Sequence, residues 1–143
     1  MSDLEDLYGS AQHPDRVVAR VRPEGSSDEV VAAVGQVSAA LEVVEQARGL
    51  LYAFHRESGR ADLALQDAVK ALAEAGEEDL AAEITTVLVG RDVLPGRWSF
   101  EVVEDYDEGY WQVFRAVEAK VRATLSDGIR HVYEAEMKQR EQR

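Results

Sequence analysis

Four carboxylates are spaced as two pairs that could share a divalent cation. Glu42 and Glu45 lie three residues apart in a segment with helical periodicity, and Glu104 and Asp107 repeat that spacing in a second such segment. Residues three apart share one face of an α-helix and lie about one turn from each other. Carboxylate oxygens are ligands that Mg²⁺ prefers, and an ion held between two facing helices could bridge the phosphates of a substrate.

This arrangement resembles the paired Glu-x-x-Glu and Glu-x-x-Asp motifs of the all-α nucleotide pyrophosphohydrolases over those four residues. The resemblance implies a Mg²⁺-dependent enzyme that hydrolyses nucleotides, with Glu42, Glu45, Glu104 and Asp107 as metal ligands. We keep this interpretation as the alternative, and Mg²⁺ is the only cofactor that it implies.

Aromatic residues are concentrated in one stretch of the second half of the chain. Six of the ten fall there, namely Trp98, Phe100, Tyr106, Tyr110, Trp111 and Phe114. The spacing of four from Tyr106 to Phe114 predicts core packing on one helix face, whereas Trp98 and Trp111 lie off that stripe and are predicted surface anchors. The leading interpretation is a surface that binds a protein partner or a small ligand. Its predicted residues are Arg91, Arg97, Trp98, Tyr106 and Trp111.

A capping box and a heptad row predict a long first helix. Ser26 and Glu29 have the spacing of a reciprocal cap, so the helix is expected to begin there and to run to about residue 56. The apolar positions recur every seven residues, at Val30, Val37, Val44 and Leu51, with Val34 and Leu41 between them. Such a seam is typical of packing between two helices.

Arg48 and His55 continue the second of these rows at positions where an apolar side chain is expected. If the first and last helices are antiparallel, both residues face the segment from Glu101 to Asp105. Its carboxylates would satisfy the two polar side chains. We expect this role to be structural.

Glycines and a proline mark the other boundaries. The predicted helices cover residues 26–56, 60–75, 77–90 and 101 onward. Gly59 and Gly76 bracket the second of them, and Pro95-Gly96 suits the centre of a type II turn in the connection before the last helix. Ser126 to Gly128 could break or kink that last helix.

These elements predict an all-α fold, either a four-helix antiparallel bundle or a helical array with two long helices. Residues 1–25 are expected to form an extended N-terminal arm, and residues 26–143 a single helical domain. The first helix is much longer than the middle two, so part of its apolar stripe would stay uncovered. We therefore expect a homodimer.

Composition excludes several classes of function. The chain has 143 residues, 45% of them apolar, a net charge of −12 and no cysteine. Disulfides and thiolate sites are therefore impossible, and the negative field disfavours nucleic acid. Charged residues interrupt the apolar runs, so we expect no membrane span and a cytoplasmic location. Neither a glycine-rich phosphate loop nor a nucleophile elbow is present, which leaves a helical interaction or ligand-binding module as the leading hypothesis.

Overall fold

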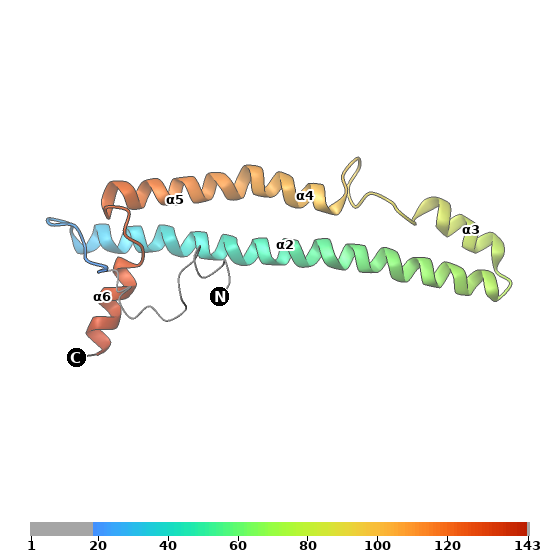
Figure 1. The fold of residues 1–143 in the computed structure, drawn as a ribbon, viewed down its shortest axis with the longest axis horizontal. Coiled ribbons are helices and arrows are strands. Elements are labelled where there is room, and N and C mark those ends of the chain that lie inside the picture. Colours follow the sequence, from blue (N-terminus) through green and yellow to red (C-terminus); the bar gives the residue numbers. More distant parts are fainter. Residues whose placement is uncertain (1–18, 143) are drawn as a thin grey trace, which may run out of the picture. The chain divides into compact units, whose positions relative to one another are not determined.

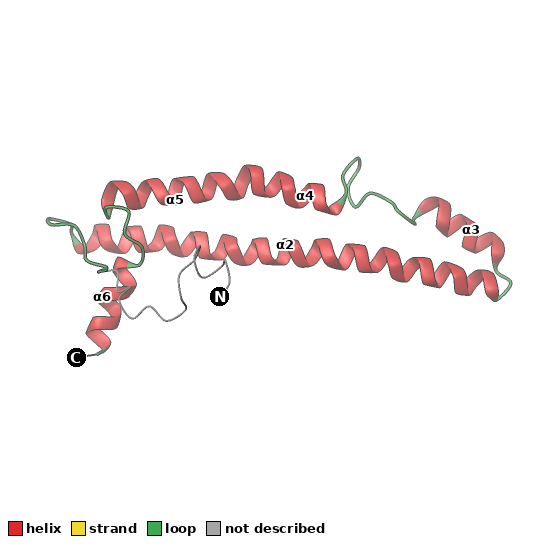
Figure 2. Ribbon diagram, viewed as in Figure 1, coloured by secondary structure: helices red, strands yellow, loops and turns green. Residues whose placement is uncertain are grey.

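The structure is a computed structural model that describes residues 19–142 (Figure 1). Within this range the regular elements are helices, apart from one isolated bridge between Leu94 and Arg97 (Figure 2). The prediction of an all-α fold with two long helices is confirmed. Most of the predicted N-terminal arm, residues 1–18, lies outside the described residues.

Helix α2 (Asp28–Glu74) is one continuous helix of 47 residues where two were predicted. The expected boundary at Gly59 is wrong, because a glycine inside a helix costs only about 1 kcal/mol relative to alanine and does not by itself break it. Gly76 does end the helix. Its φ is +90°, and the Glu77 N–H donates to the Leu72 carbonyl at 2.9 Å, which is the bond of a Schellman cap.

Four helical segments and one π-helical turn follow. They are α3 (Glu78–Val87), α4 (Ser99–Tyr106), the π turn η1 (Asp107–Trp111), α5 (Gln112–Leu125) and α6 (Val132–Glu141). Helices α4 and α5 join through η1 without a break and form the predicted last long helix (Figure 2). The possible break at Ser126 to Gly128 is present, because Asp127 and Gly128 have φ values of 52° and 75°.

The chain divides into two compact units. The first joins the residues up to Gly35 with Arg122–Arg143. Its buried side chains include Val31, Val34 and Val132. Helix α6 packs closely on the start of α2 in this unit, because a Cβ added at Gly35 would lie 3.0 Å from the Cβ of Tyr133.

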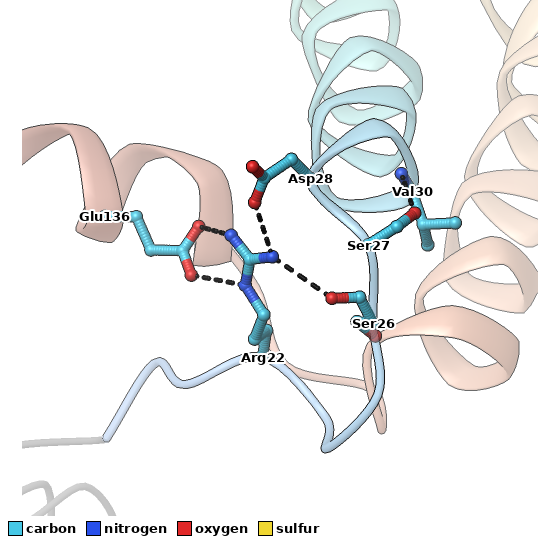
Figure 3. A network of polar contacts seen from close by, with 6 residues as sticks. All are labelled: Arg22, Ser26, Ser27, Asp28, Val30 and Glu136. Carbon is cyan, nitrogen blue, oxygen red and sulfur yellow. Dashed lines mark hydrogen bonds and ion pairs between the residues drawn. The ribbon is translucent and has the colours of Figure 1, made fainter.

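Arg22 ties the segment before α2 to α6 (Figure 3). Its guanidinium donates to both oxygens of Glu136 at 2.7 and 2.9 Å, and to Asp28 at 2.7 Å. The paired charges hold the pKa of Arg22 above its usual range and the pKa of Glu136 below its own. The end of the predicted arm is therefore anchored on its own chain.

The N-cap of α2 lies one residue later than expected. The Ser27 Oγ accepts the Val30 N–H at 3.2 Å, whereas the Ser26 carbonyl accepts a bond from Arg22 (Figure 3). Two adjacent serines offer the same capping chemistry, and the hydroxyl of the second is the one that accepts the amide three residues on.

In the second unit (Gln36–Val121), α2 and the α4–α5 helix are antiparallel and side by side (Figure 1). Three contacts fix this order. Ser38 donates to Glu118, Arg48 to Asp107, and His55 bonds to Ser99. Val44 and Val103 are buried in this unit. The heptad row of the sequence is thus used inside the chain, since the α2 face that carries Val44 also carries these contacts.

Candidate functional site

Arg48 is the centre of the contact between α2 and the last long helix. Its Nε and Nη2 donate to the two carboxylate oxygens of Asp107 at 2.7 and 3.0 Å. The guanidinium also lies 3.8 Å from the ring centroid of Trp111 and 5.1 Å from that of Tyr52. The hydrogen bonds from Arg48 lower the pKa of Asp107, so this half-buried carboxylate is held in its charged form.

The predicted partners of Arg48 and His55 were the carboxylates from Glu101 to Asp105, and that prediction is wrong. Arg48 contacts Asp107, and the His55 Nδ1 lies 2.8 Å from the Ser99 hydroxyl. Arg48 and His55 are seven residues apart on α2 and their partners are eight residues apart on the antiparallel helix, so the predicted range of five residues was too short to hold both contacts. The antiparallel order on which the prediction rested is present.

The π turn η1 brings two of these partners to one place. Both Asp107 and Trp111 belong to it and both contact Arg48, and the guanidinium of Arg115 lies 4.6 Å from the centroid of the same Trp111 ring. A π turn contains about one more residue than an α turn, so residues three or four apart across it no longer lie on the same helix face. Tyr110, predicted to be in the core, is 58% exposed.

The four carboxylates of the metal interpretation are not brought together as ligands. Asp107 is paired with Arg48, and Glu45 accepts the indole N–H of Trp111 at 2.8 Å. Glu42 and Glu104 are exposed, and the antiparallel register places them at levels about nine residues, or roughly 13 Å, apart along the helix axis. Among the residues that the structure describes, no group of three or more His, Asp or Glu side chains is placed to hold a metal.

The residues of the predicted binding surface separate into two groups. Tyr106 and Trp111 lie on the long helix, and Trp111 is taken up in the contact with α2. Arg91 and Trp98 line a groove between α2 and the connection from α3 to α4. Arg97 forms an ion pair with Asp105 at 2.7 Å. The Pro95-Gly96 turn in this connection is confirmed, with φ +71° at Gly96.

An exposed apolar row on α2 was not predicted from the sequence. It consists of Ala40, Val43, Ala47, Leu50 and Phe54, all of them exposed. The last long helix carries a second exposed row, made of Tyr110, Val113 and Val117. The signal was present as steps of three and four along α2, but alanines at alternate positions made it weaker than the valine and leucine row that faces the neighbouring helix.

The contrast between buried and exposed apolar residues is large. Across residues 19–142, six apolar side chains are buried, whereas nineteen large apolar side chains are exposed. By length and composition alone, α2 also qualifies as a helix that could cross a bilayer, which the interrupted apolar runs had led us not to expect. An exposed apolar surface of this extent is typical of a site that contacts another protein or a membrane.

Comparison of the chain with protein-family models, with curated proteins and with solved structures gives no match.

Proposed function

We propose that the chain is a non-enzymatic helical interaction module that works as a homodimer, with the exposed rows of α2 and α5 as its dimer interface. The observation that supports this most directly is the exposure of the α2 row, where Val43 is 63% and Leu50 73% accessible. Full burial of an exposed valine or leucine side chain contributes roughly 1.5–3 kcal/mol, and Val43 and Leu50 forgo most of that contribution in the isolated chain.

The area of the two rows fits a dimer interface. The larger side chains in them are Val43, Leu50, Phe54, Tyr110, Val113 and Val117, and each is between 45% and 73% exposed. Side chains of this size present on the order of 100 Å² each at such exposures, so each copy offers roughly 600 Å². Adding the intervening alanines brings this near the roughly 800 Å² that one partner contributes to a standard interface.

The spacing and charge of the α2 row favour a second copy as the occupant. Steps of three and four from Ala40 to Phe54 form the seam of a two-helix packing, and the small alanines allow two helix backbones to approach closely. A two-fold dimer places the same row on both sides. No position of this row is ionisable, so its burial against a second copy would bury no charge from the row itself.

Two leucines on α2 provide a matched test. Leu50 lies in the row, whereas Leu63 is 64% exposed but lies outside it. We expect Leu50→Glu to convert a dimer into a monomer in size-exclusion chromatography with light scattering, because it buries a charge in the seam. Leu63→Glu should leave the dimer intact. Loss of the dimer in both variants, or in neither, would overturn the proposed interface.

A lipid surface is the other occupant that an exposed apolar helix could have, and the same variants separate it. Glu42 and Glu45 lie in the middle of the apolar part of α2, where burial in a bilayer would cost several kcal/mol. We therefore expect no flotation of the chain with phosphatidylcholine vesicles. Flotation that disappears with Leu50→Glu would assign the row to a membrane instead.

A further inference from the structure

A groove lies between one turn of α2 and the connection from α3 to α4, all within the second unit. Its walls are Ser58 to Asp62 of α2, Gly90 to Val93 of the connection, and Trp98 to Phe100 at the start of α4. Its volume of about 290 Å³ is at the lower end of the range for small-ligand sites. A second hollow of about 430 Å³ continues past Asp92 over Leu65 and Leu88.

The walls of this groove are fixed by hydrogen bonds from both sides. The Gly90 N–H donates to Asp62 Oδ1 at 2.8 Å, and Gln66 donates to the other oxygen of Asp62 at 2.8 Å. Those two donors lower the pKa of Asp62, so it stays charged. On the other wall, His55 holds Ser99 at 2.8 Å. The groove is therefore formed before anything binds.

Two side chains of the groove, Trp98 and Asp92, are available to a ligand. Trp98 is 59% exposed and packs edge-on against Phe100, with ring centroids 5.3 Å apart and planes at 89°. The Asp92 carboxylate is partly buried and makes no hydrogen bond or ion pair to any part of the chain from 19 to 142. Arg91, by contrast, donates to the Val87 carbonyl and so has a partner at the end of α3.

These groups match a positive charge on an apolar stem. An aromatic face attracts a cation through its quadrupole, and a nearby carboxylate adds direct attraction. The lining of the groove holds two carboxylates, Asp62 and Asp92, against one cation, Arg91, so its own net charge is negative. An anionic ligand would instead meet the charged Asp62 and Asp92.

We propose that this groove binds an apolar cation, with the stem against Trp98 and Phe100 and an ammonium or guanidinium group beside Asp92. A lysine or arginine side chain of a partner peptide and a small organic amine have this chemistry in common. The site is separate from the dimer interface, so it does not depend on the proposed homodimer.

Titration of the full chain with phenethylamine, followed by Trp fluorescence and calorimetry, tests the proposal. We expect saturable binding that weakens at least tenfold in Asp92→Asn and in Trp98→Leu. Two control variants, Asp79→Asn on α3 and Trp111→Phe in the Arg48 contact, should retain it. Circular dichroism checks that the variants are folded. Asp92→Asn removes no hydrogen bond or ion pair within residues 19–142, so a folded variant that loses binding has lost a contact with the probe.

Further arms identify the source of the cation and the outcomes that would overturn the site. The same titration is made with the peptide acetyl-Leu-Lys-Leu-amide. If the peptide binds at least tenfold more tightly than phenethylamine, the groove is assigned to a peptide side chain, and if phenethylamine binds more tightly, to a small amine. Both results support the proposal. No saturation with either probe, equal binding of phenylacetate, or binding unaffected by Asp92→Asn would overturn it. The Leu50→Glu variant should bind equally well, which keeps this result apart from the dimer test.

Discussion

Arg48 makes three kinds of contact between α2 and the last long helix and along α2 itself. It pairs with Asp107 through two hydrogen bonds, stacks on Trp111, and lies beside Tyr52. A guanidinium is suited to this because it is planar and remains charged while it stacks. The sequence indicated that Arg48 lies in the seam, but its partner depended on the register of the opposite helix, which no local pattern fixed.

Replacing Arg48 with methionine should lower the free energy of unfolding by about 1–2 kcal/mol, because a half-buried carboxylate loses its charged donor. Urea unfolding followed by circular dichroism measures this. The control is Arg60→Met, since the Arg60–Glu57 pair is exposed at both side chains and should contribute less than about 0.5 kcal/mol. Equal effects of the two changes would contradict the assigned role.

Stability should fall with acid through two carboxylates. Arg22 lowers the pKa of Glu136, and Arg48 lowers that of Asp107. Below about pH 5 the unfolded chain therefore takes up more protons at these groups than the folded chain does, and the folded state loses their contribution as the pH falls through the lowered pKa values.

Urea midpoints between pH 7 and pH 3 provide the measurement. We expect a steeper loss for the native chain than for Asp107→Asn, whereas Glu57→Gln should follow the native chain. A native chain and an Asp107→Asn variant with parallel acid profiles would argue against the pairing.

At the scale of the helices, the order of the elements and the approximate start of the first long helix followed from patterns in the sequence, whereas its predicted end near residue 56 is wrong because α2 continues to Glu74. The helix seam, the Pro95-Gly96 turn and the break after Leu125 were all accessible in this way. Gly59 was not, because a single glycine reports a local preference that 47 residues of continuous helix override. The π turn was not predicted either, because the steps of four from Tyr106 to Phe114 were interpreted as one continuous α-helix.

Two glycines on and after α2 should respond in opposite directions to the same substitution. Gly59→Ala should raise the free energy of unfolding by about 0.5–1 kcal/mol, because Gly59 is inside a helix and an added Cβ meets nothing within 4 Å. Gly76→Ala should lower it by about 1 kcal/mol, because φ at Gly76 is +90°. Thermal unfolding of both variants is the measurement, and shifts of the same sign would contradict the helix boundaries.

The register of the two long helices also bears on the metal hypothesis. It separates Glu42 from Glu104 and leaves Glu45 and Asp107 bonded to Trp111 and Arg48. We therefore expect the melting temperature to stay within about 1 °C on addition of Mg²⁺ or Mn²⁺ at millimolar concentration, since only a ligand that binds the folded state raises it. A rise of several degrees that is lost in Glu45→Gln would restore the metal interpretation.

At the scale of the whole molecule, the chain uses one seam of α2 within itself and leaves a second seam exposed. A homodimer was predicted because the first helix is much longer than the middle helices that could cover its heptad row, but that row faces α4 and α5 within the chain. The expectation now rests on a different set of residues, from Ala40 to Phe54, which alanines had made inconspicuous. The surface that remains exposed after folding could not be predicted from the sequence, because it depends on which face of α2 packs against α4 and α5.

The mass of the native chain in solution tests this claim most directly. Sedimentation equilibrium across a range of micromolar concentrations should give twice the chain mass of 15.8 kDa. The species should be a single dimer rather than a series of larger assemblies, since a two-fold contact closes on itself. A mass of 15.8 kDa throughout that range would contradict the account.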